Sequence, residues 1–286
     1  MKLLGAPAAD ENSIYVDAFD DTLANAMIDV YDITGTTKTL GNADATLAST
    51  DRRAILGATL TAVRTITLPA ASAIPAGVPI AIIVPSGAIS TSYALVFAAA
   101  GSDTIHGAAS AGMMTHGLVF LASDGVSAWS MTRLPAVSLE VATQEDVTTT
   151  TLTDSTALKR YVPPGKYRVR AEFTIWSANA SEGVRGNVAF SGTATTRAAR
   201  HQVSANDTGA TSTMSSRAMS ISSTALAGND PLSFTAYSTG SGYFFREFIL
   251  TVTAGGFLSV QFAHWSGTSS TCSLGVGSQL QIEPIR

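Results

Sequence analysis

The sequence predicts a mainly β protein, and three observations lead to this prediction. Charged residues make up only 13% of the 286-residue chain, against roughly 25% in an average soluble domain. Lysine and glutamate, which usually cover helix surfaces, number only four and seven. Most apolar runs contain valine, isoleucine, phenylalanine and tyrosine, which suit a pleated, half-buried surface. A helical bundle or coiled coil does not fit this composition.

Several other classes of protein are excluded by composition. The hydrophobic content of 45% is too high, and the net charge of -4 too small, for a disordered chain. The sequence contains no uncharged apolar stretch of about 18 residues, so it predicts no membrane-spanning helix. The start of the chain lacks a signal-peptide core, so we expect the protein to stay where it is made or to leave by assembly into a particle. The single Cys272 excludes an internal disulfide framework and a multi-cysteine zinc site.

The chain is expected to divide into three units and a connector. The first 140 residues carry 12 acids and 6 bases, a net charge of -6, whereas the remaining 146 carry 9 acids and 11 bases, a net charge of +2. Residues 1–60 hold few apolar side chains and are interpreted as an attachment segment, in which Asp51–Leu56 is a candidate capped helical turn. The other expected units are a small all-β unit over 61–134, a connector over 135–142, and a C-terminal domain over 143–286.

The 61–134 unit is predicted to contain short strands separated by turns rich in proline, glycine and aspartate. The expected strands are Val63–Leu68, Val78–Val84, Tyr93–Ala98, Asp103–Gly107, Leu118–Ala122 and Val126–Met131. A spacing of roughly 10–15 residues per strand is typical of a small all-β unit rather than of a βαβ repeat.

The 143–286 unit has the clearest strand alternation in the chain. Tyr167–Trp176 places five apolar residues on one face and Arg168, Arg170, Glu172 and Thr174 on the other, as in a strand with one buried side. We interpret the threonine run Val147–Leu152 as the first strand of this unit. The remaining expected strands are Leu158–Val162, Val184–Phe190, Arg200–Ser204, Met214–Ile221, Leu232–Tyr237, Tyr243–Thr253, Phe257–Ala263 and Ser278–Ile285. This set predicts a β-sandwich or jelly roll.

Both β units resemble parts of tailed-bacteriophage virion proteins. The stretches that resemble tail-fibre and appendage segments are Arg64–Pro69, Ile74–Gly77, Ala100–Ala108 and Leu121–Trp129. The 143–286 unit is similar to the trimeric, tumour-necrosis-factor-like jelly rolls of phage head fibres, decoration proteins and some tail fibres. The features that carry this second resemblance are the threonine run, the Pro-Gly turn before Tyr167–Arg170, Ala254–Ala263 and Gly277–Glu283. The resemblance implies a fold and a virion role, and it leaves residues 1–60 unmatched.

The sequence offers no pattern that predicts catalysis or a cofactor. No Gly-x-Ser-x-Gly elbow and no phosphate-binding glycine motif occurs. The four histidines form neither a His-x-His pair nor a cluster with carboxylates, although one histidine per chain on a threefold axis could hold a metal. Acids near the N-terminus lack the ligand spacing of a calcium loop. We therefore expect no catalytic residue, no cofactor and no metal ligand, and the scattered arginines do not predict a nucleic-acid site.

Two groups of residues are candidates for contacts with partners. Residues that could attach the N-terminal segment to the virion are Tyr15, Phe19, Asp20, Asp21 and Tyr31. Aromatic residues expected near strand ends are Trp176, Tyr243, Phe244, Phe245 and Trp265. These aromatics could stack on sugars or lie in a trimer interface, and the alternative is that they fill the sandwich core.

These observations predict a non-enzymatic virion structural protein. We expect a homotrimeric surface fibre or decoration protein of a tailed phage, bound to capsid or tail proteins through its N-terminal region, with the head as the favoured location. The main alternative is a tail-fibre adhesin that recognises a host surface glycan or protein. A depolymerase is a third option, but no paired carboxylates in a recognisable setting support it.

Overall fold

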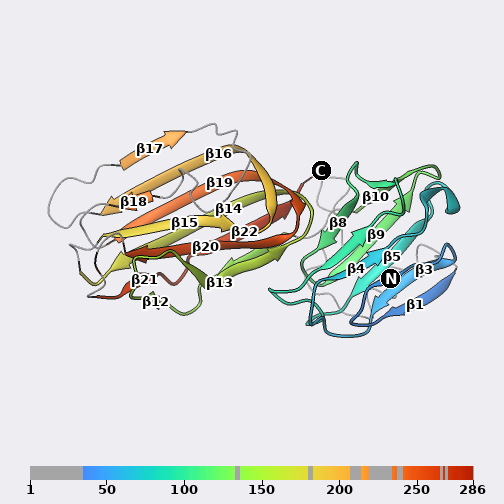
Figure 1. Cartoon of the computed structure of the whole chain (residues 1–286), viewed down its shortest axis with the longest axis horizontal. Coiled ribbons are helices and arrows are strands. Elements are labelled where there is room, and N and C mark those ends of the chain that lie inside the picture. The colour runs from blue at the N-terminus through green and yellow to red at the C-terminus, as the bar shows by residue number, and fades with distance from the viewer. Residues whose placement is uncertain are drawn as a thin grey trace, which may run out of the picture.

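A computed structural model describes residues 35–132, 136–179, 183–206, 214–218, 234–236, 241–264, 267 and 270–285. Within these residues the chain is mainly β, which confirms the predicted fold class. It forms two lobes with separate hydrophobic cores, which lie side by side in Figure 1. The described part of the chain contains no helix long and apolar enough to cross a membrane.

The N-terminal lobe contains two sheets and one short 3-10 helix, η1 (Ala71–Ala73). Its six-stranded sheet has the order β1-β3-β5-β9-β10-β7 and its four-stranded sheet the order β2-β4-β6-β8. The strands are β1 (Thr36–Leu40), β2 (Ala45–Thr46), β3 (Asp51–Leu56), β4 (Arg64–Thr67), β5 (Pro79–Val84), β6 (Leu95–Ala98), β7 (Thr104–Ile105), β8 (Ser110–Met113), β9 (Gly117–Ser123) and β10 (Ala128–Met131).

The first six strands of this lobe wind as a short β-solenoid. Successive strands alternate between the two sheets, and β1, β3 and β5 pair in parallel, as do β2, β4 and β6. Each turn of the chain therefore adds one strand to each sheet, and neighbouring turns bury a shared core between the sheets. Strands β8 and β9 then pair antiparallel with β6 and β5 and end the winding. The sequence predicted short strands here but not their parallel stacking.

The segment before residue 60 corrects two predictions. Asp51–Leu56 is strand β3 and not a helical turn. The Asp51 carboxylate does not cap a helix, because it accepts hydrogen bonds from Thr36 Oγ1 and the Ala48 amide, both at 2.8 Å. Strands β1 and β3 share a sheet and a core with β5, so the expected boundary at residue 60 does not separate two units. Leu40, Leu47 and Leu56 of this stretch point into that core, whereas Ile55 lies on the opposite face of the sheet.

The C-terminal lobe also contains two sheets. An eight-stranded sheet has the order β11-β22-β14-β19-β16-β17, with β12 and β21 joined to it, and a four-stranded sheet has the order β13-β20-β15-β18. The strands are β11 (Val137–Glu140), β12 (Glu145–Val147), β13 (Thr153–Val162), β14 (Gly165–Ser177), β15 (Val184–Phe190), β16 (Thr193–Asn206), β17 (Met214–Ala218), β18 (Phe234–Ala236), β19 (Ser241–Ala254), β20 (Gly256–His264), β21 (Cys272–Leu274) and β22 (Gln279–Pro284).

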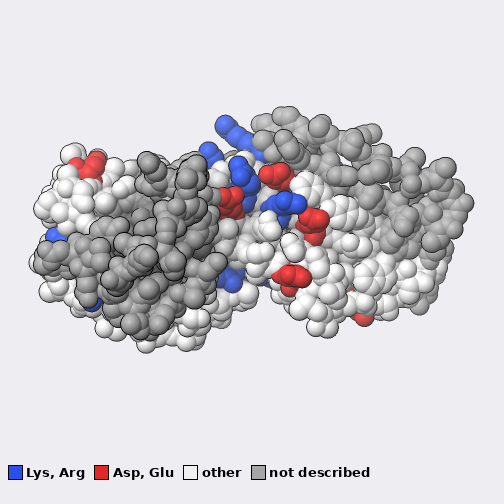
Figure 2. Space-filling model, turned by 180° about the vertical axis from the view of Figure 1, so that it is seen from behind, with Lys and Arg blue, Asp and Glu red and all other residues white. Residues whose placement is uncertain are grey.

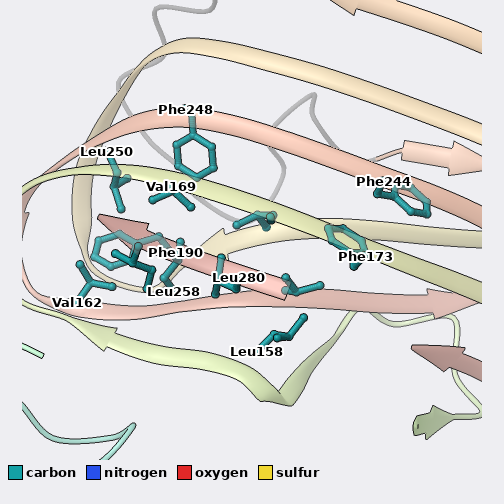
Figure 3. Close-up of a cluster of buried hydrophobic side chains, with 14 of the residues drawn as sticks. Leu158, Val162, Val169, Phe173, Phe190, Phe244, Phe248, Leu250, Leu258 and Leu280 are labelled. Atoms are coloured by element: carbon teal, nitrogen blue, oxygen red, sulfur yellow. The ribbon is translucent and has the colours of Figure 1, made fainter. Parts of the chain in front are cut away.

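The two sheets of this lobe enclose one core. The predicted alternation of β14 is confirmed, because Arg168 and Arg170 are exposed while the five residues predicted to face the core are buried, namely Tyr167, Val169, Ala171, Phe173 and Ile175. Figure 3 shows side chains from both sheets meeting in this core, among them Phe173 and Phe244 from the larger sheet and Leu258 from the smaller one. This arrangement is a β-sandwich, whereas the jelly-roll connectivity and the homotrimer stay predictions.

Two further predictions about this lobe are wrong in detail. Within the threonine run Val147–Leu152 only Val147 belongs to a strand, as the last residue of β12. The expected connector 135–142 contains β11, which pairs with β22 and buries Val137. Strand β11 is therefore the first strand of the sandwich, and it is too short to show a clear alternation of buried and exposed residues in the sequence.

A proline-rich turn lies where the two lobes touch. The Tyr161 amide donates a hydrogen bond to the Thr91 carbonyl at 2.9 Å across the boundary. Gly112 of β8 lies against Pro163 so closely that a Cβ atom there would overlap the proline ring. The turn itself is held by the buried Tyr167 hydroxyl, which donates to the Pro163 carbonyl at 2.9 Å. Gly165, at a φ of +151°, continues this turn into β14.

Candidate binding face on the eight-stranded sheet

The outward-pointing side chains of β14, β19 and β22 form the candidate site, here called the outer sheet face. Because alternate residues of a strand point to opposite faces, every second residue of these strands faces away from the core. The residues of the outer sheet face are Arg168, Arg170, Glu172, Thr174, Trp176, Tyr243, Phe245, Glu247, Ile249, Gln279, Gln281 and Glu283. All three strands contribute charged or amide side chains to it.

Ion pairs organise the charged part of this face. Arg168 pairs with Glu283 of β22 at 3.4 Å and lies 3.8 Å from Glu247 of β19. Arg170 pairs with Glu172 on its own strand at 3.0 Å. Figure 2 shows basic and acidic side chains gathered near the middle of the molecule in the view from behind. Exposed pairs of this kind contribute about 0–1 kcal/mol each to stability, so they orient the side chains more than they hold the fold.

A short hydrogen bond couples Tyr243 and Glu172 on adjacent strands. The Tyr243 hydroxyl donates to Glu172 Oε1 at 2.6 Å. This bond, together with the Arg170 guanidinium, outweighs partial burial and lowers the pKa of Glu172. Burial, the hydrogen bond to Glu172 and its negative charge raise the pKa of Tyr243 to about 12. At neutral pH the face therefore presents a carboxylate whose position is fixed by a neutral tyrosine.

Phe245 forms an apolar centre beside these charges. Its ring is half-buried, and the Arg170 guanidinium lies 5.1 Å from the ring centroid. A cation over an aromatic face contributes roughly 0.5–1 kcal/mol at an exposed site. Ile249, four residues further along β19, is also half-buried and extends the apolar strip toward Arg168. The outer sheet face thus combines apolar area with charges held at defined positions.

The predicted aromatic candidates separate into three groups. Trp176 and Tyr243 are half-buried members of the outer sheet face, and Gly275 lies against the Trp176 ring. Phe244 is only 2% exposed and stacks on Phe173, with ring centroids 5.1 Å apart and planes 6° from parallel. This packing makes Phe244 a core residue, so it leaves the candidate set. Trp265 lies outside the described residues.

The predicted attachment residues all lie outside the described residues; they are Tyr15, Phe19, Asp20, Asp21 and Tyr31. Local sequence patterns do not mark the glutamines and the acids of β19 and β22 as site residues. Only the pairing register shows that these residues lie beside Arg168 and Arg170, since they are far away in the chain.

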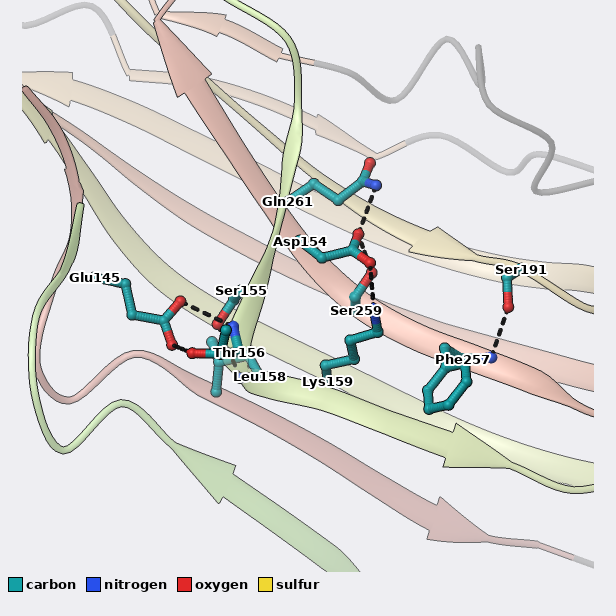
Figure 4. Close-up of polar contacts among 10 residues, drawn as sticks. All are labelled: Glu145, Asp154, Ser155, Thr156, Leu158, Lys159, Ser191, Phe257, Ser259 and Gln261. Carbon is teal, nitrogen blue, oxygen red and sulfur yellow. Dashed lines mark hydrogen bonds and ion pairs between the residues drawn. The ribbon is translucent and has the colours of Figure 1, made fainter. Parts of the chain in front are cut away.

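A second polar cluster lies on the four-stranded sheet around Asp154 (Figure 4). Asp154 accepts hydrogen bonds from Lys159, Ser259 and Gln261, each at 2.8 Å. Burial raises the pKa of Asp154, but these hydrogen bonds together outweigh it and lower the pKa below the usual value. Glu145 accepts from the backbone of Thr156 at 3.0 Å close by. The cluster bridges the register shift between β13 and β20, so its role is to hold a bulge.

A buried serine–histidine contact is the nearest approach to a catalytic pair in the described residues. Ser177 Oγ lies 3.4 Å from His264 Nδ1, and His264 Nε2 lies 3.0 Å from the Ser270 carbonyl oxygen. Ser177 is 7% exposed and His264 is fully buried, so a substrate has no access to either group. Their hydrogen bonds join the ends of β14 and β20.

The single cysteine lies in the core, and the described histidines and acids form no metal-binding cluster. Cys272 is fully buried, as expected for a small apolar group, and burial together with the nearby Asp146 charge raises its pKa to about 12. The described ranges contain no group of three or more His, Cys, Asp or Glu side chains placed to hold a metal ion. His106, one of the four histidines, accepts a hydrogen bond from the Met131 amide at 2.9 Å.

Comparison with known proteins assigns no family. No family model matches the chain, and no curated protein is similar to it. The outer sheet face must therefore be interpreted from its own chemistry. Its mixed charges and half-buried rings suit contact with another surface.

Proposed function

We propose that the protein is a non-enzymatic structural protein of a tailed-phage virion. It is a homotrimeric surface fibre or decoration protein, attached through its N-terminal region, and the head is the favoured location. The resemblance of both β units to phage appendage proteins supports this proposal. The observation that carries it is the outer sheet face, where five charged side chains lie on three adjacent strands of a chain that is only 13% charged.

The chemistry of this face suits contact between copies of the chain. Arg168 and Arg170 alternate with Glu172, Glu247 and Glu283, so the surface carries both signs of charge and can be complementary to itself. Phe245 and Ile249 supply apolar area whose burial favours association. Charges that contribute little to the stability of one chain then fix the orientation of the next one.

Native mass spectrometry and immunogold electron microscopy test the proposal. The intact chain is expected at three times its 29.4 kDa mass, and Arg168→Glu/Arg170→Glu should reduce the trimer fraction. Lys38→Glu, on strand β1 of the N-terminal lobe, is the control and should leave the assembly unchanged. Antibody against residues 143–286 should label the phage head. A monomeric native mass would contradict the trimer, and a virion without label would contradict the structural role.

A tail-fibre adhesin is the second candidate, and the placement of Trp176 and Tyr243 favours it. Both aromatics lie on the outer sheet face with Glu172, and aromatic rings beside fixed hydrogen-bonding groups suit the binding of sugars. Label confined to the tail tip would support this function. Glycan-array binding should then be lost in Trp176→Ala and kept in Phe257→Ala, which removes a half-buried ring from the other sheet. Binding that survives Trp176→Ala would contradict this assignment of the site.

A further inference from the structure

A second apolar cluster lies on the six-stranded sheet of the N-terminal lobe, on the face opposite its core. This cluster, here called the outer apolar patch, consists of Ile55 on β3, Ala81 and Ile83 on β5, and Leu118 and Phe120 on β9. The alternate residues Ile80, Ile82 and Val84 of β5 point into the main core instead. Cross-strand pairing aligns Ile55, Ile83 and Leu118 in one row and places Phe120 beside Ala81.

The burial of this patch is unusual for the outside of a sheet. Ala81 is fully buried and Ile83 is only 3% exposed, although they point away from the lobe's core. Antiparallel and mixed sheets that face water usually show polar side chains on that face. A contiguous apolar patch on a sheet is normally covered by another segment or by a partner. The three central strands therefore carry a surface suited to a covering element.

The sequence that precedes β1 fits such an element. Residues 1–34 end directly before Gly35, next to β1, which is the edge strand of this same sheet. Adjacent strands are about 4.8 Å apart, so β5 lies only about 10 Å from β1. The segment is therefore attached at the border of the patch and is long enough to cross it.

Five apolar residues of this segment recur at a spacing that suits one face. They are Val16, Phe19, Leu23, Met27 and Val30, at intervals of 3, 4, 4 and 3 residues, whereas Ile14 and Ile28 fall outside this series. This spacing is that of the apolar stripe of an amphipathic helix. Asp17, Asp21 and Asp29 fall on the opposite side of the same helical pattern. Arg53, which is paired in register with Ala81, adds a cation at the border of the patch. Residues 1–34 carry seven acids and one base, so their net charge is opposite to that of Arg53.

We infer that residues 1–34 pack over the outer apolar patch of their own chain, with Val16, Phe19, Leu23, Met27 and Val30 facing it. The acids opposite this stripe then point outward from the lobe. This inference is independent of the virion role, since it concerns contacts within one chain. It refines the attachment candidates, because Phe19 faces the lobe whereas Asp21 remains open to a partner.

Photo-crosslinking of the full-length protein tests this packing without assuming a register. Leu23→benzoylphenylalanine should crosslink, within one chain, to peptides that contain β5 or β9, as mapped by mass spectrometry. Asp21→benzoylphenylalanine is the matched control and should lose these crosslinks. Covalent dimers on a denaturing gel would show that a second copy covers the patch, and crosslinks to other peptides would place the segment elsewhere. Either outcome overturns the inference.

A dye-binding measurement checks the same contact without a crosslinker. Phe19→Ser/Leu23→Ser/Met27→Ser should uncover the patch and raise the fluorescence of added anilinonaphthalene sulfonate by about twofold or more. Asp17→Ser/Asp21→Ser/Asp29→Ser changes the same number of residues on the other side and should leave the fluorescence unchanged. Circular dichroism confirms that both variants keep their strands. Equal fluorescence in the two variants would contradict the packing.

Discussion

Two neighbouring phenylalanines on β19 allow a direct test of which face of the strand is the core. Phe244 is 2% exposed and stacks on Phe173, whereas Phe245 is half-buried on the outer sheet face under Arg170. Phe244→Ala removes a buried ring and leaves a cavity, which costs about 3–5 kcal/mol. Of this, the stacked pair with Phe173 accounts for about 0.5–1.5 kcal/mol. Phe245→Ala removes a cation–π contact of about 0.5–1 kcal/mol and the burial of a half-buried ring, but it leaves no closed cavity because that ring is partly open to solvent.

The free energy of unfolding decides between these values. Urea unfolding of the C-terminal lobe can be followed by circular dichroism, with the slope against urea checked for each variant. Native mass spectrometry at the same protein concentration separates a loss of folding stability from a loss of assembly. We expect Phe244→Ala to lower the unfolding free energy at least about twofold more than Phe245→Ala. Equal losses, or a larger loss in Phe245→Ala, would refute the assignment of the two faces.

Three further predictions concern hydrogen bonds and the contact between the lobes. Tyr167→Phe should lower the free energy of unfolding in urea by about 1–1.5 kcal/mol, because the Pro163 carbonyl loses its buried donor. An unchanged free energy of unfolding would show that this hydrogen bond does not stabilise the turn. Because the pKa of Glu172 is lowered in the folded state, its stabilisation is present above the usual value of 4.5 and is lost as the pH falls through the lowered pKa. Tyr243→Phe should flatten this acid dependence of the unfolding midpoint, and an unchanged pH profile would contradict the coupling. Gly112→Leu should push β8 away from Pro163 and increase the radius of gyration measured by small-angle X-ray scattering, whereas Gly41→Leu, at a position with open space around it, should not.

Local alternation predicted the sandwich because each long strand there has one buried side. The inward positions of β14 are those that the sequence indicated, and Val184–Phe190 was predicted with the bounds of β15. A strand of 7 or 13 residues shows enough alternate positions to define its buried face without any knowledge of its neighbours. Strands of three or four residues do not, and β8, β11 and β21 were missed. The equally short β4, β6 and β10 were predicted because clear turn residues flank them.

The solenoid could not be predicted from local patterns, because parallel and antiparallel neighbours require the same alternation. Arg53 of β3 pairs with Ala81 of β5, and nothing near either residue specifies that partner. The error at Asp51 has a related cause. An aspartate before a short apolar run can cap a helix or bond to nearby backbone in a turn, and here it accepts from Thr36 and Ala48. Tertiary pairing with β1 and β5 decides between the two.

The outer sheet face depends on register in the same way, and this is why its residues could not be grouped from the sequence. Tyr243 and Glu172 are 71 positions apart, and Arg168 and Glu283 are 115 apart. A shift of β19 by one residue would turn Tyr243 and Glu247 to the core face and separate them from the charged side chains of β14. The buried side chains of the two strands therefore determine which charges meet on the outside. Because exposed ion pairs add little to the stability of one chain, their concentration on this face favours recognition of a second surface as its role.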